Sequence, residues 1–347
     1  MFWIIGGKEI AQAAAKLTNW PWLLWLSDQL EHTEWHGFTL YDLIFPLFLF
    51  MAGVAMPFSF AKRIEHGATK AQLYRHVFIR ALALVFLGMI YNDLMKFDWA
   101  TMRYTSVLGH IGIAYFFAAL IVLNANAVGQ FIWMVGLLVA YWAMMKFIPV
   151  PGYGAGDLSP AHTLNDYLDR LLMPGQLKFG NRDPLGILAT IPAIGTALAG
   201  AITGHLLKSD RYSKYFKTTA MAVAGVVCFA LAYLWNFDFP INKNLWSSSF
   251  VLHCAGYSLL LLSLFYLVID VWRFRGWAMI FVVIGSNSIL MYLARRCVDF
   301  DFTTHYFFDG MVGTTGRYQP LLFAVAVVIV EWLMLLVLYK NRIFLKV

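Results

Sequence analysis

Residues 39–61 read TLYDLIFPLFLFMAGVAMPFSFA, and this run decides the fold. Asp42 is its one charged residue, and aromatic and aliphatic side chains fill most of the remainder. A helix rises about 1.5 Å per residue, so a helix of this length crosses the roughly 30 Å of hydrocarbon in a bilayer. The run therefore predicts a transmembrane helix.

Further apolar runs are long enough to cross a bilayer by the same argument. They are 73–92, 104–123, 127–147, 186–207, 216–236, 248–270, 277–296 and 319–339. We expect 1–17 to be one more helix whose first turns are missing, and the tryptophan-rich 20–31 to be a helix in the membrane interface. The sequence predicts an all-α, polytopic membrane helix bundle with about ten transmembrane helices plus that short interfacial helix, in a single transmembrane domain over 1–347.

Composition supports the same fold class. The 347 residues are 61% hydrophobic and 13% charged, about half the charged share of a soluble protein. In a membrane protein, basic residues concentrated in the loops explain the net charge of +7. No nucleic-acid partner is therefore expected. Cys228, Cys254 and Cys297 form no CxxC pair, so we expect reduced, packed thiols.

The distribution of Lys and Arg predicts the orientation. Basic side chains gather in 62–75, 208–217 and 273–275 and in the tail up to Lys346. The positive-inside rule makes these loops and the C-terminus cytoplasmic. The remaining longer loops, which include 8–38 and 148–185, are then extracytoplasmic, and the second of these is long enough to cap a site.

A polar cluster precedes the first long apolar run, in HTEWHG at 32–37. Asp28, His32 and His36 are spaced i, i+4, so one helical face could present all three. Histidine titrates near neutral pH, and a carboxylate such as Glu31, Glu34 or Asp42 could orient it as a general base. Two imidazoles at this spacing could bind zinc, but no HExxH pattern or further ligand set is present, so no metal is expected. A solvated loop with incidental histidines explains the pattern equally well.

Other polar residues interrupt the apolar runs or gather at their predicted outer ends. Arg80, His76, His110, His253 and Asn287 lie within the runs, and together they indicate a polar cavity. Snorkelling, helix packing and interhelical hydrogen bonds are the simpler explanation of each. Arg103, Asp183, Lys243 and Asn244 lie at the predicted outer ends, where Asp42 and Asp183 could simply cap helices.

Five ordered motifs resemble the heparan-α-glucosaminide N-acetyltransferase family of transmembrane acyltransferases. HTEWHGFTLYDLIFPLFLFMAG at 32–53 carries the pattern His-x-x-Trp-x-Gly-x-Thr-x-x-Asp-x-x-Phe-Pro. SVLGHIGIAYFFA, DPLGILATI, PINKNLWSSSFV and GSNSILMYL follow at 106–118, 183–191, 240–251 and 285–293. The chain resembles a compact, bacterial type of this family, which implies residence in a bacterial inner membrane.

The resemblance implies an activity and a catalytic histidine, and the polar residues around the motifs supply further candidates for the site. Members pass an acetyl group from acetyl-CoA across a membrane to a sugar, which in the lysosomal member is the terminal glucosamine of heparan sulfate. The catalytic histidine corresponds to His32, and we expect Asp42 to orient it. For the acetyl-CoA donor and the oxyanion we expect Arg103, His110, Lys243, Asn244 and Asn287, and for an extracytoplasmic amino sugar or oligosaccharide Glu34, Trp35 and Asp183. A homodimer is a further expectation from the family.

Departures from the family pattern leave alternatives open. His110 stands where the family has Arg, Leu185 stands where it has Glu, and the Leu-Asp-x-x-Arg-Gly that opens the family core is absent. Whether His32 acts as a base or carries the acetyl group itself is open. A transporter or flippase of a sugar-linked molecule, or an inactive membrane scaffold, would also fit a polar cavity among many helices, although no inverted repeat is visible.

Overall fold

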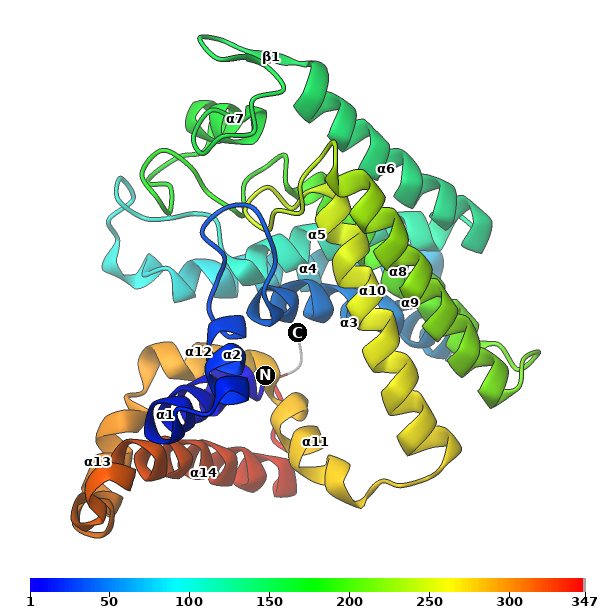
Figure 1. Cartoon of the computed structure of the whole chain (residues 1–347). Coiled ribbons are helices and arrows are strands. Elements are labelled where there is room, and N and C mark those ends of the chain that lie inside the picture. The colour runs from blue at the N-terminus through cyan, green and yellow to red at the C-terminus, as the bar shows by residue number, and fades with distance from the viewer. Residues whose placement is uncertain (346–347) are drawn as a thin grey trace. The chain divides into compact units, whose positions relative to one another are not determined.

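The structure is a computed structural model that describes residues 1–345; Lys346, assigned to the cytoplasmic tail, and Val347 lie outside it. Among these residues, eight helices are long and apolar enough to cross a membrane, or nine if one bent pair counts as a span. Strands in the described part are limited to β1 (Pro149–Val150) and β2 (Gly154–Ala155). The predicted all-α membrane bundle is confirmed (Figure 1).

The chain folds into two compact units. The central unit comprises Thr33–Phe38 and Asp42–Arg273. The terminal unit comprises Met1–His32, Thr39–Tyr41 and the chain from Phe274 onward. The single domain expected over 1–347 stays a prediction.

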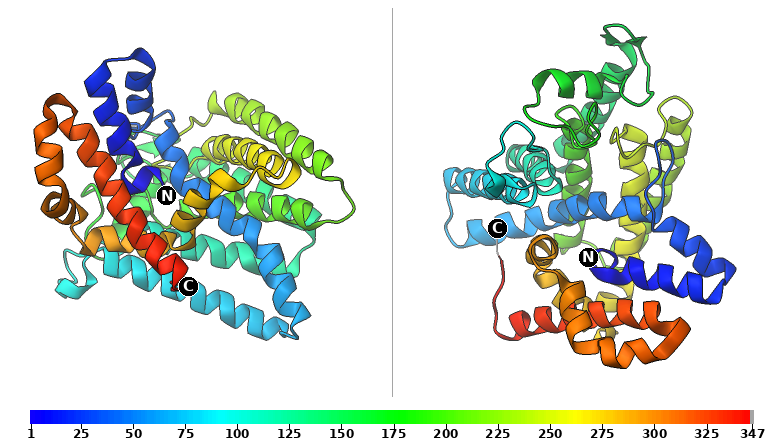
Figure 2. Two further views of the ribbon diagram at one scale, coloured as in Figure 1. Left: turned by 90° about the horizontal axis from the view of Figure 1, so that it is seen from below. Right: turned by 90° about the vertical axis from the view of Figure 1, so that its left-hand side faces the viewer.

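Seven long helices build the central unit. They are α3 (Ile44–Glu65), α4 (Lys70–Tyr91), α5 (Val107–Asn124), α6 (Ala127–Phe147), α8 (Thr190–Lys208), α9 (Lys214–Asn236) and α10 (Ser248–Tyr266). Helix α8 packs against α3, α5 and α6, and α9 lies alongside α10 (Figures 1 and 2). The core between these helices contains almost fully buried side chains, among them Tyr115, Leu198, Trp246 and Phe250.

Small residues let α3 and α8 approach each other closely. A Cβ atom on Gly53 would lie 2.0 Å from the carbonyl oxygen of Ala197. One on Gly200 would lie 2.0 Å from the carbonyl oxygen of Phe50. Lipid tails are as apolar as helix surfaces, so close backbone packing of this kind is a main source of helix association in membranes.

The long loop at 148–185 is itself folded. It contains the β1–β2 hairpin and α7 (Leu164–Leu172). Thr163 caps the start of α7, because its hydroxyl accepts the N–H of Asp166. Leu164 and Val150 pack with Tyr141 of α6 in a separate small core. The loop is therefore an ordered cap on the end of the central unit at which α6 ends and α8 begins (Figure 1).

The terminal unit gathers both ends of the chain. It contains the π-helical turn Trp3–Gly7, α1 (Lys8–Thr18), α2 (Pro21–Gln29), α11 (Met279–Ser286), α12 (Ser288–Cys297), α13 (Phe300–Val312) and α14 (Gln319–Lys340). Helices α1, α11 and α13 pack on α14 around Ile5, Ile284 and Leu335. The tryptophans of α2 are more than half exposed, as an interfacial helix requires.

Three segments differ from their predictions. Within 1–17 the helix α1 is short and polar, because Lys8, Glu9 and Gln12 fall in its first turns, and it is not among the candidate spans. The predicted span 277–296 is bent by 58° between α11 and α12. The predicted loop 297–318 contains α13.

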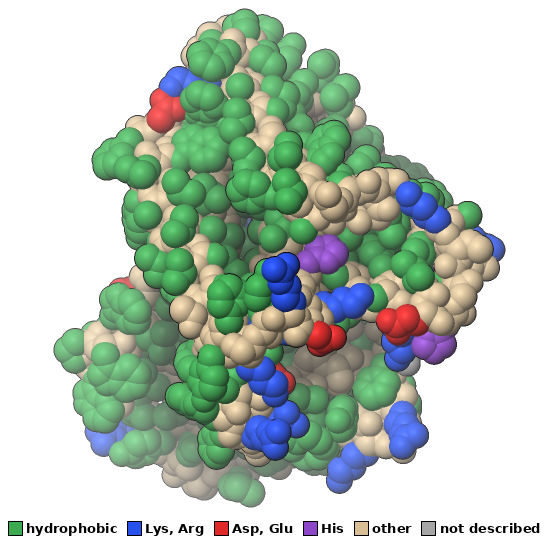
Figure 3. Space-filling view, turned by 90° about the vertical axis from the view of Figure 1, so that its right-hand side faces the viewer, with side chains coloured by type: hydrophobic (Ala, Val, Ile, Leu, Met, Phe, Trp, Pro, Cys, Tyr) green, Lys and Arg blue, Asp and Glu red, His purple; other side chains and the backbone are tan. Residues whose placement is uncertain are grey.

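Hydrophobic side chains cover most of the face shown in Figure 3, and charged side chains form small separate groups.

Candidate active site

The histidine cluster does not form a helix. Helix α2 ends at Gln29, and residues 32–38 are irregular, so the predicted helical face joining Asp28, His32 and His36 is wrong. Hydrogen bonds outside a helix replace the helical pattern: Thr33 Oγ1 donates to Asp42 at 3.1 Å just beyond the loop, and the N–H of Gly37 donates to the distant Ile241 carbonyl at 2.8 Å. The φ of +114° at Gly37 turns the chain out of helical geometry.

His32 lies at the edge of the terminal unit. Its side chain is exposed, and its ring centroid lies 4.8 Å from that of Tyr41. Asp42, which the sequence predicts as its orienting carboxylate, belongs to the central unit. The orienting role of Asp42 therefore stays a prediction.

Asp42 and Lys243 form a buried ion pair in the central unit. Lys243 Nζ lies 3.0 Å from Asp42 Oδ1, and the Asp42 side chain is fully buried. Burial lowers the pKa of Lys243, and the negative charge of Asp42 offsets part of that effect. A buried carboxylate is tolerated only when it is paired and hydrogen-bonded, and Lys243 together with Thr33 meets that need.

The Pro-Ile-Asn-Lys-Asn motif folds as the turn that presents Lys243. Asn242 Oδ1 accepts the N–H of Leu245 at 3.0 Å, and Ser247 Oγ accepts the N–H of Asn242 at 3.1 Å. Asn242 Nδ2 lies 3.2 Å from Nδ1 of His36. Asn244 is half-buried in the same turn. The turn brings the first and fourth sequence motifs together.

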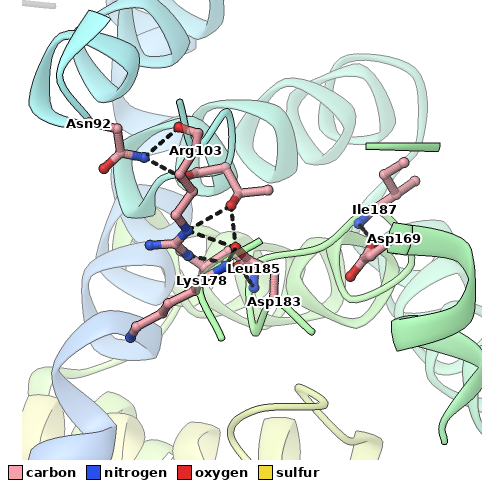
Figure 4. A network of polar contacts seen from close by, with 8 residues as sticks. Asn92, Arg103, Asp169, Lys178, Asp183, Leu185 and Ile187 are labelled. Carbon is pink, nitrogen blue, oxygen red and sulfur yellow. Dashed lines mark hydrogen bonds and ion pairs between the residues drawn. The ribbon is translucent and has the colours of Figure 1, made fainter. Parts of the chain in front are cut away.

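Arg103 and Asp183 form a second ion pair at the helix ends of the same unit (Figure 4). Arg103 Nε and Nη2 each donate to an Asp183 oxygen at 2.7 Å, and Thr105 Oγ1 donates at 2.7 Å. The backbone N–H groups of Leu185 and Lys178 donate at 2.9 Å and 3.1 Å. Asp183 therefore caps its own turn and binds Arg103 at the same time.

This donor set determines the protonation state of Asp183. Burial raises its pKa, but the hydrogen bonds and charge of Arg103, together with the Thr105 hydroxyl, lower it by more. The net pKa lies below the usual value for an aspartate, so the carboxylate is ionised at neutral pH.

His110 is buried in the interior of the central unit, where the charge of Asp183 acts on it. It is only 3% exposed, and its ring packs 5.6 Å from Phe45 and 5.3 Å from Trp246. Among the described residues, neither ring nitrogen has a hydrogen-bond partner of acceptable geometry. Buried polar atoms are nearly always satisfied, so these nitrogens indicate a place for a ligand atom or a water molecule.

The aromatic side chain of Trp35 lies under the cap. Trp35 Nε1 donates to the Leu158 carbonyl at 2.8 Å, and the guanidinium of Arg182 lies 4.6 Å from the Trp35 ring centre. Glu34 beside it is exposed. The ring is half-buried and fixed, which suits an aromatic surface for stacking.

Asn287 lies in the terminal unit at the break between α11 and α12. Its Nδ2 donates to the Ile343 carbonyl at 2.8 Å, and its Oδ1 accepts the N–H of Leu345 at 3.0 Å. Both ends of the amide thus hold the C-terminal tail. Its predicted contact with the acetyl donor stays a prediction.

Two residues of the cap were not anticipated from sequence. Asp169 is fully buried, and its Oδ1 accepts the N–H of Ile187 at 2.9 Å; burial raises its pKa to about 7, although that hydrogen bond opposes the change. Burial also lowers the pKa of Lys178, as do the charges of Arg103 and Lys243. The aspartates and lysine of this loop follow no spacing that singles out Asp169 or Lys178, so only the fold reveals them.

The charges at these helix ends do not balance. The charges of Arg103 and Lys243 both act on Lys178, and the paired carboxylates are Asp183 for Arg103 and Asp42 for Lys243. The excess positive charge suits an anionic ligand such as a phosphate. Over the described residues, no group of three His, Cys, Asp or Glu side chains is arranged to hold a metal ion.

Comparison with known proteins gives a relationship that covers most of the chain. No family model matches it. Two curated relatives, from Mus musculus and Homo sapiens, are both named heparan-alpha-glucosaminide N-acetyltransferase. Each is 26% identical over 377 residues, which covers 91% of this chain and 56% of the relative, so the chain spans about half the length of these relatives. The resemblance indicated by the five motifs is confirmed: the chain is similar to the heparan-alpha-glucosaminide N-acetyltransferases over nearly all of its length.

Proposed function

We propose that the chain is a transmembrane acyltransferase that moves an acetyl group from acetyl-CoA to an extracytoplasmic amino sugar or glycan. The observation that carries this proposal is the convergence of distant motifs on two buried ion pairs. Asp42 of the first motif binds Lys243 of the fourth, and Asp183 of the third binds Arg103. The names of the two relatives support an amino-sugar acceptor.

The donor is a polyanion, and the charge excess suits it. Arg103, Lys178 and Lys243 are candidates for its phosphates, since guanidinium and ammonium groups bind phosphate through charge-assisted hydrogen bonds. The pantetheine arm is narrow and extended, so it fits between helices. The unpaired ring nitrogens of His110 are candidates for contacts with the thioester carbonyl, with Asn244 and Asn287 as further candidates.

His32 supplies the proton chemistry in this proposal. The acceptor nitrogen or oxygen attacks the thioester carbon, a new C–N or C–O bond forms, and the C–S bond breaks. His32 takes the proton from the acceptor and returns it to the CoA thiolate, so protons balance. If His32 instead carried the acetyl group, transfer would take two steps through an acetyl-imidazole. A hydrogen bond to the tetrahedral oxyanion would contribute about 10²–10³ in rate.

The acceptor would meet the aromatic surface of the cap. Sugar rings pack their C–H faces on aromatic side chains, and Trp35 is held rigid for that purpose by Leu158 and Arg182. Glu34 and Asp183 are candidates for hydrogen bonds to the acceptor. The protein is an integral membrane protein by its spans; the bacterial inner membrane, the extracytoplasmic His32 loop, the cytoplasmic C-terminus and a homodimer remain part of the proposal.

The decisive experiment measures free thiol released from acetyl-CoA by the purified protein in detergent. We expect release to depend on an added acceptor, with glucosamine as the first trial, and the acetylated sugar to appear in equal amount by mass spectrometry. Slow release without acceptor would represent hydrolysis. A panel of amino sugars and oligosaccharides that yields no acetylated product would contradict the proposal.

One observation favours a transporter as the second candidate. The helix pair α11–α12 is broken with a 58° bend, and broken helices line substrate sites in many transporters. A transporter would move a sugar-linked molecule into vesicles without consuming the thioester. Uptake by proteoliposomes with intact acetyl-CoA would therefore favour this candidate over the acyltransferase.

A further inference from the structure

The terminal unit holds His32 through a set of contacts that the motifs do not anticipate. The His32 ring packs against Tyr41, with centroids 4.8 Å apart and planes inclined by 56°. Lys8 Nζ lies 5.0 Å from the centre of the same Tyr41 ring. Tyr41 is therefore held between an ammonium group and the imidazole, in an arrangement that favours a fixed ring.

Helix α1 anchors this arrangement. Lys8 Nζ also lies 2.9 Å from Glu31 Oε2, and Gln12 Nε2 donates to Glu31 Oε1 at 2.6 Å. Glu31 directly precedes His32 in the sequence. Two residues of α1 thus fix the side chain next to the histidine, and one of them also contacts the ring that packs on it.

Backbone contacts close the loop on the other side. Thr39 Oγ1 donates to the carbonyl of Glu31 at 2.5 Å, and the N–H of Leu40 donates to Gln29 Oε1 at 3.4 Å. These bonds bring Tyr41 back to the end of α2, beside the residue that precedes His32. Within the terminal unit, hydrogen bonds to Gln29 and Glu31 and the ring contact with Tyr41 therefore hold the end of the loop that carries His32.

We infer that Tyr41 is a positioning residue for His32, and that Lys8 and Glu31 keep the Tyr41 and His32 rings in contact. The inference rests on the catalytic role proposed for His32. A general base is effective only when its nitrogen stays within hydrogen-bond reach of the proton that it removes, so rotation about its χ1 and χ2 bonds must be limited. Packing on Tyr41 limits that rotation.

The contacts distinguish ring packing from hydroxyl chemistry. Tyr41→Phe keeps the ring that packs on His32, whereas Tyr41→Leu removes it. We expect Tyr41→Phe to retain kcat within about twofold. We expect Tyr41→Leu to lower kcat by about threefold to tenfold, the rate change that corresponds to the free energy of one aromatic contact, with little change in KM. Tyr306→Leu is the matched control, because Tyr306 lies in the same unit and is 78% exposed.

A second measurement does not depend on activity. Diethyl pyrocarbonate modifies neutral imidazoles, and peptide mass spectrometry gives the rate at His32 alone. We expect Tyr41→Leu to increase this rate by about threefold to tenfold and Tyr41→Phe to leave it unchanged. Lys8→Met should act in the same direction as Tyr41→Leu, whereas Lys16→Met, an exposed position on the same helix, should have no effect.

The outcomes separate this inference from the proposed function. An inactive wild-type protein would contradict the proposed function, and unchanged modification rates in the Tyr41→Leu and Lys8→Met variants would contradict the positioning role on their own. An active protein whose kcat is unaffected by Tyr41→Leu would also overturn the positioning role. If Tyr41→Phe were as impaired as Tyr41→Leu, the hydroxyl rather than ring packing would act, and the inference would be wrong.

Discussion

Buried charges at the membrane boundary are the most informative residues of this protein. Taking a carboxylate out of water costs several kcal/mol, and its pairing with a cation repays that cost only with good geometry. Asp42 and Asp183 both have fully buried side chains, yet each keeps a cation within 3.0 Å. Apolar residues would stabilise a helix end in the membrane at lower cost, so the presence of both buried pairs supports a role in binding anionic or polar ligands.

The Asp42–Lys243 pair gives a stability prediction. Lys243→Met removes the cation from the buried Asp42 carboxylate while the Thr33 hydroxyl still donates to it, and should lower the free energy of unfolding by about 3–5 kcal/mol. Thermal unfolding in detergent measures this loss. Lys96→Met is the control, because Lys96 pairs with Asp93 while 70% exposed, and it should cost less than about 1 kcal/mol. Equal effects of the two variants would contradict the buried-pair account.

Asp169 gives a pH prediction. Its folded pKa of about 7 lies above its ordinary value of 3.8, so the folded state binds more protons than the unfolded state between these values. The stability contribution is fully present below the lower value and is lost as the pH rises through about 7, by an amount of the order of 4 kcal/mol. Asp169→Asn should flatten the stability curve between about pH 4 and pH 7, the interval bounded by the two pKa values. The exposed Asp210→Asn should leave the curve unchanged, and a wild-type curve without a decline in this range would refute the prediction.

At the scale of helices, backbone-to-backbone contact at glycines sets how α3 and α8 pack in the central unit. Gly53 and Gly200 place the backbones of α3 and α8 in contact, so the interface has no room for a Cβ atom. The polar ends of these helices carry the candidate site: α3 follows directly after Asp42, and α8 follows the turn that begins at Asp183. The geometry of the site therefore depends on the α3–α8 contact.

This contact can be tested with two glycine variants. Gly200→Val should force α8 away from the Phe50 carbonyl and destabilise the protein by about 3 kcal/mol or more, with loss of monodisperse material on gel filtration. Gly136→Ala on α6 is the matched control, because a Cβ atom added there would meet no other atom within 4 Å, and it should be neutral or stabilising by up to about 1 kcal/mol. A folded, fully stable Gly200→Val protein would contradict the packing argument.

The elements also show what could be predicted from sequence. The apolar spans were predictable, because about 20 apolar residues in a row leave few alternatives to a membrane helix. The His32–Phe38 loop was not, because the bond partners that replace helical hydrogen bonds, Asp42 and Ile241, come from elsewhere in the chain. The break at Asn287 was missed for the same reason, since its amide bonds to the tail at Ile343 and Leu345.

The candidate site was predictable in part. Motif residues identified Asp42, Asp183 and Lys243, the polar residues at predicted helix ends added Arg103, and the structure joins the four as two pairs. Which residues pair could not be predicted, because ion pairs between loops 80 or more residues apart depend on the whole fold. The contact of Tyr41 with His32 could not be predicted, because a tyrosine in an apolar run resembles any other core or interface residue.

For the whole molecule, the distribution of basic residues predicts sidedness. In a cysteine-free background, Glu34→Cys should react with a membrane-impermeant maleimide added outside intact cells. Lys208→Cys should react only after the cells are opened, because its loop is predicted to be cytoplasmic. Glu34 lies in a loop and Lys208 is the last residue of α8, and both are exposed, so labelling reports the side of the membrane rather than burial. Labelling of both positions from the same side would contradict the predicted orientation.

The account depends most directly on His32. The measurement that tests it is the rate of acceptor-dependent CoA release by the wild-type protein, by His32→Ala and by His36→Ala, in detergent with one active acceptor. We predict that His32→Ala lowers kcat by about 10²–10⁴, the range for loss of a general base, whereas His36→Ala keeps most of the activity. Equal rates for the wild type and His32→Ala would contradict the central claim.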